Sequence, residues 1–125
     1  MDFKKHLIYI SHPYGGKVEN EIETAGIVQR LYMNDELYDN CCFVSPIHCF
    51  SFMYHNTEYY KGLSFCTDLL KHCKLMLLCG DWKSSVGCTA EKEICDELNI
   101  PYIEVKDMEA LDKLIESGDI LNYIK

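Results

Sequence analysis

The stretch LMLLCGDWKSSVGCTAE, residues 75–91, decides the expected fold of this chain. Its first five residues are continuously apolar, as in a strand that is buried on both faces of a parallel sheet. A Gly-Asp-Trp turn, a short Ser/Gly loop and a helix start follow. In parallel α/β sheets, ligands bind beside the loops after the strands, and N–H groups at a helix start attract anions. Glu91 at this place is therefore either a solvated side chain or part of a reaction site.

Length and composition indicate one globular domain. The chain has 125 residues, 48% hydrophobic and 12% aromatic, enough for one core that buries roughly two thirds of the unfolded surface. A net charge of −8, from 20 acidic and 12 basic residues, argues against a nucleic acid polymer as partner, because basic contacts to phosphate carry that affinity. No apolar run approaches the roughly 18 residues of a membrane helix, and no secretory segment is evident. We expect a soluble, cytoplasmic protein with no membrane partner.

The chain has eight cysteines and no C-x-x-C pair. They are Cys41, Cys42, Cys49, Cys66, Cys73, Cys79, Cys88 and Cys95. Their spacing does not match zinc-binding patterns, and disulfide scaffolds belong to secreted proteins. Most lie in apolar runs, where a free thiol behaves as a small hydrophobic side chain. Two pairs are seven residues apart, which places each pair on one helical face. We therefore predict packed thiols and no metal site.

Apolar periodicity alternates between strand and helix along the chain. The predicted strands are residues 6–10, 41–45, 75–79 and 101–105, and the predicted helices are residues 18–33, 59–73, 89–98 and 108–117. Residues 34–40 are expected to form a polar break, residues 47–57 a loose connection and residues 120–124 a short tail. The order predicts one domain over residues 1–125: a three-layer α/β/α sandwich with a parallel, Rossmann- or flavodoxin-like sheet and right-handed crossovers.

Aromatic residues are concentrated around the connection before the second long helix. Tyr54, Tyr59, Tyr60 and Phe65 exceed what one small core can absorb. Exposed apolar patches usually mark contacts between molecules. We therefore expect a homo-oligomer, most simply a homodimer.

Three blocks of residues resemble the nucleoside 2-deoxyribosyltransferase-like superfamily, and are nearest to its short phage and bacterial members. The first is Ile8-Tyr9-Ile10 with the turn Pro13-Tyr14-Gly15-Gly16, similar to the family's first strand and substrate loop. The second is Thr67-Asp68-Leu69, similar to a family motif whose aspartate lies in the active site. The third is Ser85-x-Gly87-x-x-x-Glu91, similar to the loop and helix that present the catalytic glutamate. Together they span about two thirds of the chain, in the family's order.

The resemblance implies cleavage or transfer at an N-glycosidic bond, without a cofactor, and the residue types suit that chemistry. A carboxylate beneath the sugar carbon can form a covalent glycosyl-enzyme. Glu91 would be this nucleophile, kept ionised by the helix dipole, and Tyr9 would orient it. Asp68 would protonate the leaving base, with its carboxyl roughly 5–8 Å from that of Glu91. The candidate substrate-binding residues are Ser85, Gly87, Trp82, Tyr14, Gly15, Gly16 and Asn20.

The substrate is expected to be a nucleoside or a deoxynucleoside 5′-monophosphate. Family members that act on free nucleosides tend to carry an aspartate at the position of Ser85. A serine hydroxyl beside backbone N–H groups favours phosphate, whereas an aspartate repels it. The first loop, however, has no arginine to neutralise a phosphate, and only Lys17 lies close by.

Other interpretations remain open. Glu91 can belong to a solvated first helical turn, Asp68 to the outer face of an amphipathic helix, and Tyr9 to the core. A second class of function is a non-catalytic protein that binds a nucleotide or an NAD-derived metabolite in the same cleft. A third is an interaction module whose aromatic segment serves mainly as an oligomer interface. A Glu91 side chain that points to bulk water would favour the second and third classes.

Overall fold

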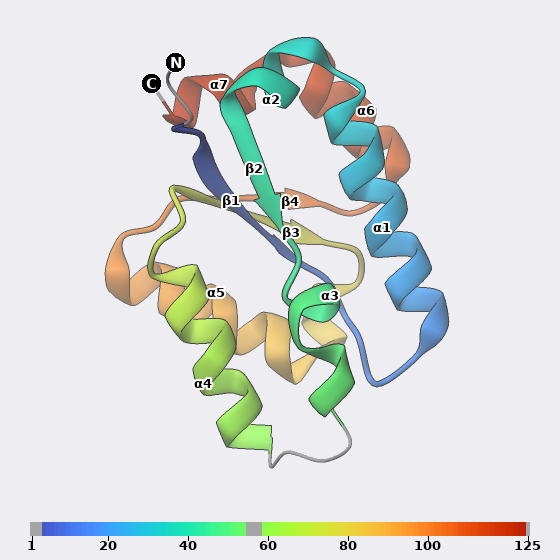
Figure 1. The fold of residues 1–125 in the computed structure, drawn as a ribbon, viewed down its shortest axis with the longest axis vertical. Helices are drawn as coiled ribbons and strands as arrows, with labels where there is room; N and C mark the ends of the chain where they lie inside the picture. Colours follow the sequence, from blue (N-terminus) through green and yellow to red (C-terminus); the bar gives the residue numbers. More distant parts are fainter. Residues whose placement is uncertain (1–3, 55–58, 125) are drawn as a thin grey trace.

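The computed structural model describes residues 4–54 and 59–124 as a sheet covered by helices on both faces (Figure 1). The sheet has four strands: β1 (His6–Ser11), β2 (Cys41–Val44), β3 (Leu75–Cys79) and β4 (Tyr102–Val105). Every pairing is parallel, in the order β2-β1-β3-β4. The predicted α/β fold, flavodoxin- or Rossmann-like, is confirmed, and each predicted strand is present to within one residue at either end.

Seven α-helices and two short 3₁₀ turns connect and cover the strands in the described part of the chain. The helices are α1 (Val18–Tyr32), α2 (Asp35–Asn40), α3 (Pro46–Phe50), α4 (Tyr59–Leu70), α5 (Val86–Leu98), α6 (Met108–Ser117) and α7 (Asp119–Ile124). The 3₁₀ turns are η1 (Ser51–Met53) and η2 (Trp82–Ser84). Within residues 4–54 and 59–124, none of the helices combines the length and apolar character needed to cross a bilayer.

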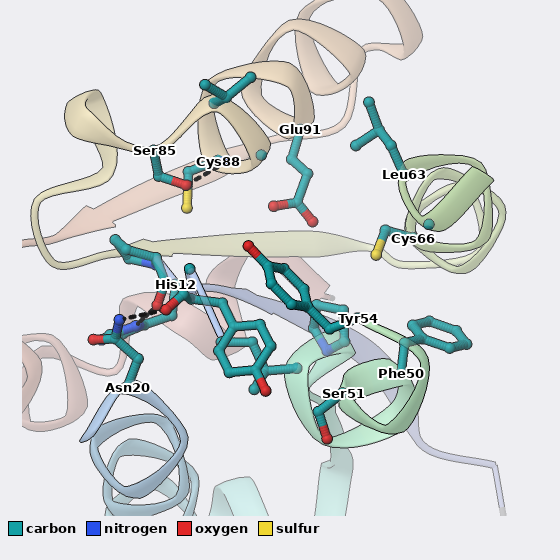
Figure 2. Close-up of a pocket in the computed structure, with 18 of the residues that line it drawn as sticks. His12, Asn20, Phe50, Ser51, Tyr54, Leu63, Cys66, Ser85, Cys88 and Glu91 are labelled. Atoms are coloured by element: carbon teal, nitrogen blue, oxygen red, sulfur yellow. Dashed lines mark hydrogen bonds between the residues drawn. The ribbon is translucent and has the colours of Figure 1, made fainter. Parts of the chain in front are cut away.

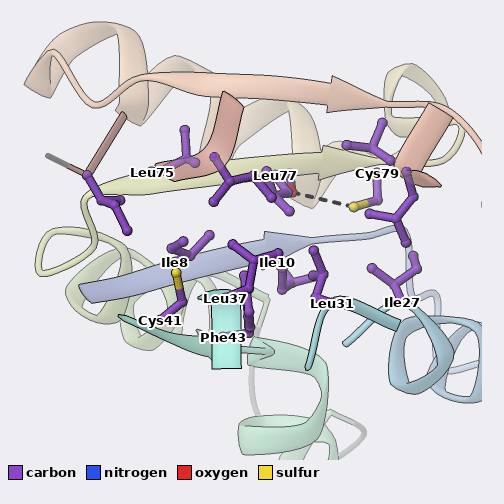
Figure 3. Packing of buried hydrophobic residues seen from close by; sticks show 14 residues of the cluster. Ile8, Ile10, Ile27, Leu31, Leu37, Cys41, Phe43, Leu75, Leu77 and Cys79 are labelled. Atoms are coloured by element: carbon purple, nitrogen blue, oxygen red, sulfur yellow. Dashed lines mark hydrogen bonds between the residues drawn. The ribbon is translucent and has the colours of Figure 1, made fainter. Parts of the chain in front are cut away.

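Alternation along the two central strands divides the core into two layers. Ile8 and Ile10 of β1, with Leu77 of β3, face the cluster that α1, α6 and α7 cover (Figure 3). Tyr9, between Ile8 and Ile10, and Met76, directly before Leu77, face the opposite cluster, which α4 and α5 cover. Successive side chains of a strand point to opposite faces, so a continuous apolar run is what a strand between two helical layers requires.

Three connections differ from the prediction, and each difference has a local cause. Residues 34–40 contain α2, because the Asn34 side chain accepts a hydrogen bond from the Leu37 amide and caps a helix there. The loose connection begins with α3 and η1, because Ser45 caps α3 and Pro46 occupies its first turn. The expected tail is α7. Residues 55–57 of the predicted connection lie outside the described residues.

The helix predicted over residues 89–98 is α5, and it begins three residues before the predicted start. The Ser85 hydroxyl accepts a hydrogen bond from the Cys88 amide at 3.2 Å, so α5 begins at Val86 and not at Thr89. Glu91 is therefore the sixth residue of the helix and lies in its second turn. The influence of the helix dipole falls off within the first turn, so the expectation that the dipole keeps Glu91 ionised is wrong.

The cysteines pack as predicted. Five of them are buried, namely Cys41, Cys73, Cys79, Cys88 and Cys95, and all eight are free thiols. Cys88 and Cys95 lie on one face of α5 against the sheet, and Cys73 follows α4 into the same cluster. Burial raises the pKa of the Cys73, Cys79 and Cys95 thiols to about 12, so they are uncharged at neutral pH.

We predict that Leu77→Ala lowers the free energy of unfolding by about 2–5 kcal/mol, because it opens a cavity in a fully buried position of a central strand. Leu98→Ala is the matched control, since Leu98 is 46% exposed at the end of α5, and it should change stability by less than about 0.5 kcal/mol. Urea denaturation of both variants tests this, and equal losses would contradict the assignment of Leu77 to the core.

Candidate functional site

A cavity of about 630 Å³ lies at the carboxyl end of the sheet. Segments that follow three strands line it: the loop after β1, the start of α3 after β2, and the start of α5 after β3, with α4 closing one side (Figure 2). The chain leaves β1 toward β2 on one side, while β3 lies on the other. Such a switch in strand order is where parallel α/β sheets bind ligands.

Glu91 lies at the floor of this cavity. Its carboxylate points from α5 into the cavity (Figure 2), although the residue is only 6% exposed. The Tyr9 hydroxyl donates a hydrogen bond to Oε2, and the Ser11 hydroxyl donates one to Oε1 at 2.9 Å. Among the described residues Glu91 is the only buried carboxylate. It is not part of a solvated first turn.

The two donors come from one strand because of its period of two. Tyr9 and Ser11 are two residues apart on β1, so both side chains point to the face that α5 covers. Both residues are completely buried. The sequence analysis identified Tyr9 and missed Ser11, although the same alternation places Ser11 beside it at the strand end.

Burial controls the protonation of this group. Removal of Glu91 from water raises its pKa from 4.5 to about 7, while the hydrogen bonds from Tyr9 and Ser11 act in the opposite direction. Burial and the neighbouring carboxylate raise the pKa of Tyr9 well above 10. The Tyr9 hydroxyl therefore stays protonated and acts as the donor in the hydrogen bond to Glu91. A carboxyl group with a pKa near neutrality can exchange a proton or act as a nucleophile.

Two thiols flank the carboxylate. Cys66 on α4 and Cys88 on α5 both line the cavity, one on each side of Glu91 (Figure 2). Burial, together with the charge of Glu91, raises the pKa of Cys66 to about 11. Both side chains therefore present neutral, polarisable walls to a ligand.

The loop after β1 contributes the predicted residues Tyr14, Gly15 and Asn20 to the cavity wall. The Asn20 amide donates to the Tyr14 carbonyl oxygen at 2.8 Å, which ties the loop to the first turn of α1. Gly15 and Gly16 adopt φ values of +60° and +73°, a left-handed conformation that glycine adopts without steric cost. Gly16 shapes the turn but does not line the cavity.

Aromatic rings form the side of the cavity opposite α5. Tyr14 meets Tyr54 of the segment after η1 edge to face, with ring centroids 4.9 Å apart. Phe50, at the end of α3, stacks on Phe65 of α4 at 6.0 Å. Figure 2 shows Tyr54 and Phe50 across the cavity from Glu91. The cavity thus joins an acidic floor to an aromatic wall.

Ser85 and Gly87 also border the cavity, as predicted. The Ser85 hydroxyl is the cap of α5, and Val86 and Gly87 form the first turn of that helix. The first N–H groups of a helix have no partner within the helix. This edge of the cavity therefore offers backbone donors to an anionic group.

The structure does not bring Asp68 to the cavity. Its side chain is 75% exposed and lies 3.6 Å from the Lys71 ammonium group, so the expected approach of the Asp68 and Glu91 carboxyl groups is not found. The cause is helical geometry: Cys66 faces the cavity, and a residue two positions later points about 200° away around the helix.

Trp82 is also displaced from the expected rim. It does not line the cavity. Its indole Nε1 donates to a carboxylate oxygen of Glu104 on β4 at 2.8 Å, which holds the ring over the strand end.

His12, in the loop after β1, also lines the cavity, and the sequence analysis does not name it as a site residue. It is buried, with Nδ1 2.7 Å from the Pro13 carbonyl oxygen and Nε2 3.6 Å from a carboxylate oxygen of Glu23 on α1. The ring nitrogens therefore face its own loop and α1, and this arrangement braces the loop after β1.

Residues 6–105 match the family described as domain of unknown function DUF7768, and the chain belongs to that family. The match covers the whole sheet and every segment that lines the cavity. No curated protein matches the chain.

We predict that Glu91→Gln stabilises the fold at about pH 8 and leaves stability nearly unchanged at about pH 4. In the unfolded chain Glu91 ionises near pH 4.5, whereas in the folded chain it ionises near pH 7. Stability is therefore lost as the pH rises between these values, by about 3 kcal/mol in total. The Glu91→Gln variant has no ionisable group at this position, so its stability does not fall in this way as the pH rises.

Urea denaturation at the two pH values measures this effect. Glu93→Gln is the control, because Glu93 is exposed on the same helix, and it should show no such dependence. An equal effect of both substitutions at pH 8 would contradict a desolvated Glu91.

Proposed function

We propose that this DUF7768 member cleaves or transfers the N-glycosidic bond of a nucleoside or nucleoside 5′-monophosphate, with Glu91 as the nucleophile. One observation carries the proposal: a buried carboxylate points into a cavity large enough for a nucleoside, and each of its oxygens accepts a hydroxyl hydrogen bond. The resemblance of Tyr9 and of the Ser85-x-Gly87-x-x-x-Glu91 block to the nucleoside 2-deoxyribosyltransferase-like superfamily supports it.

The reaction would proceed in two steps. In the first, an oxygen of the Glu91 carboxylate attacks C1′ as the bond from C1′ to the base nitrogen breaks. The bond electrons pass to the base, which takes up a proton from water, and a glycosyl ester on Glu91 remains. In the second, water or another base attacks C1′ and releases a proton to solvent, and the ester electrons return to Glu91. Water gives hydrolysis and a base gives transfer.

Tyr9 and Ser11 position the nucleophile. Their hydroxyl groups bond to the two carboxylate oxygens and favour the charged form against the effect of burial. They also fix the carboxylate plane, so that attack needs little reorganisation. The bonds weaken as negative charge leaves Glu91 in the ester and strengthen again when the carboxylate is released.

The cavity has matching walls for the rest of the substrate. Tyr54 and Phe50, across the cavity from Glu91, suit the flat face of a base, and the lining residue Tyr14 packs against Tyr54. Val86 and Gly87 at the start of α5 suit the 5′ end of the sugar, where backbone N–H groups can bind a phosphate. Lys17, which follows the loop after β1, also lines the cavity.

Binding without chemistry is the second candidate function. It is favoured by the pKa of about 7 for Glu91, which leaves part of the carboxyl protonated at neutral pH, and by the exposed position of Asp68. In this case the cavity holds a nucleotide or an NAD-derived metabolite intact. Tight binding without base release by the wild-type protein would favour this function over catalysis.

We also propose that the protein forms a homo-oligomer. Several large apolar side chains are exposed, among them Val18, Ile22, Phe52 and Val86. Tyr54, Tyr60 and Phe65 of the predicted interface are exposed as well, and the side chain of Tyr59 lies outside the described residues. Apolar and aromatic surface of this extent is typical of subunit contacts.

We predict that Glu91→Ala abolishes base release and leaves ligand affinity within about threefold, because it removes the nucleophile and keeps the cavity walls. The assay incubates the protein with deoxy- and ribonucleosides and their 5′-monophosphates, with and without an acceptor base, and measures free base. Glu93→Ala, with an exposed carboxylate on the same helix, is the control and should retain activity. Undiminished activity of Glu91→Ala would end the enzymatic proposal. Asp68→Asn in the same assay tests the predicted general acid.

We predict that Ser85→Ala weakens binding of a 5′-monophosphate more than binding of the corresponding nucleoside. The substitution removes the hydroxyl that caps α5 and should also lower stability by about 1 kcal/mol. Ser45→Ala removes the corresponding cap of α3 and controls for the loss of stability. Calorimetric titration measures both ligands, and equal weakening would argue against phosphate at this edge.

We predict that sedimentation velocity gives a mass of at least twice the 14.5 kDa of one chain. Phe52→Ser, which removes exposed apolar surface without touching the core, should shift the distribution toward monomer. A wild-type monomer at the concentrations used for assay would contradict the proposed oligomer.

A further inference from the structure

We propose that the substrate carries its positive charge on the aglycone, as an N-ribosyl pyridinium or an N7-alkylpurinium nucleoside does. The inference rests on the proposed function and names the substrate class of the same cavity. It rests on four points: the buried anionic floor of the described cavity, the effect of a ligand's charge on Glu91, the way in which the bond electrons must leave the sugar, and the aromatic wall opposite the floor.

The first feature is the charge of the floor. Glu91 is buried and its field is little screened, whereas Lys17, the cationic side chain among the described lining residues, is exposed and screened by solvent. With Glu91 ionised, the net field inside the cavity is therefore that of an anion. A cationic group gains attraction from this field when it enters, and a neutral one does not.

The second step concerns the ionisation of Glu91 when a ligand fills the cavity. A neutral ligand excludes the remaining water and stabilises the protonated form further, which deactivates the nucleophile. A cationic ligand stabilises the carboxylate instead, because opposite charges at close range favour the charged form. A cationic substrate thus activates its own nucleophile on binding.

The third step concerns the leaving group. When the Glu91 oxygen bonds to C1′ of a cationic nucleoside, the C1′–N electron pair moves to the ring nitrogen and cancels its positive charge. The aglycone leaves as a neutral molecule and takes up no proton. Water then attacks C1′, the ester electrons return to Glu91, and the water proton passes to solvent. This reaction uses only Glu91, Tyr9 and Ser11 at the floor. It needs no general acid, which agrees with the position of Asp68 outside the cavity.

The aromatic wall fits the same ligand. The faces of tyrosine and phenylalanine rings attract a cation, with a contribution of about 0.5–2 kcal/mol. Tyr14 and Tyr54 lie edge to face at 4.9 Å, so the two rings present differently oriented surfaces to one ligand. A flat cation between this wall and Glu91 would have the aromatic rings on one side and the Glu91 carboxylate on the other, and both attract positive charge.

Paired substrates that differ in charge test the inference. One pair is 7-methylguanosine and guanosine, and the other is nicotinamide riboside and its neutral dihydro form. Release of the free aglycone is measured for the wild type. Glu91→Gln, which lacks the proposed nucleophile, serves as the control for release by spontaneous hydrolysis. We expect kcat/KM for each cation to exceed that of its neutral partner at least about 100-fold. The neutral partner needs a general acid to protonate its leaving group, and general acids contribute a factor of about this size.

A binding measurement is independent of turnover. 1-Methylnicotinamide is a pyridinium with no glycosidic bond, and nicotinamide is its neutral partner. We expect the wild type to bind the cation about tenfold more tightly than the neutral compound, and Glu91→Gln, which keeps the shape of the side chain, to lose this preference.

The outcomes separate the two proposals. Equal cleavage of the neutral and cationic members, or no preference for 1-methylnicotinamide, overturns the cationic substrate and leaves the nucleophilic role of Glu91 standing. Absence of aglycone release from every compound overturns both proposals. Selective cleavage of the cations together with a preference that depends on Glu91 supports both.

Discussion

A carboxylate that is withdrawn from water keeps its charge only where other donors replace the lost hydration. In this protein the donors are two hydroxyl groups of β1, which reach across from the sheet to Glu91 on α5. The bonds require that Tyr9 and Ser11 face the α4–α5 layer. A register shift of one residue in β1 would turn both side chains to the other face. The pairing of β1 between β2 and β3 therefore determines the state of the site as well as the shape of the core.

The sequence predicts the sheet well because its strands are apolar runs between clear breaks. It predicts short helices poorly, since α2 and α3 have too few residues for a periodic pattern and depend on the caps at Asn34 and Ser45. At the site, the sequence predicts Glu91 and Tyr9 because each lies in a block that resembles a family motif. Ser11 has no motif and is recognised only once the strand face is known. The direction of Asp68 depends on the rotation of α4, which the core contacts of its neighbours set.

The floor and the walls of the cavity are built in different ways. The floor belongs to a central strand and to α5, which are packed in the core. Much of the wall belongs to α3, η1 and the loop after β1, which are short and held by local bonds such as those of Ser45 and Asn20. Elements with few buried contacts open at low free energy. The wall can therefore move without disturbing the Glu91 geometry.

The buried cysteines make the dynamics of the protein measurable by chemistry. The thiolate is the form of cysteine that attacks alkylating reagents, and burial raises the pKa of Cys73, Cys79 and Cys95 to about 12. A native molecule therefore reacts at these positions only while the surrounding element is open. Cys79 lies at the end of β3 and Cys95 in α5, whereas Cys49 is exposed and serves as an internal reference for reagent activity. Mass spectrometry of time-resolved labelling would then give a separate opening rate for each element, in the unmodified natural chain.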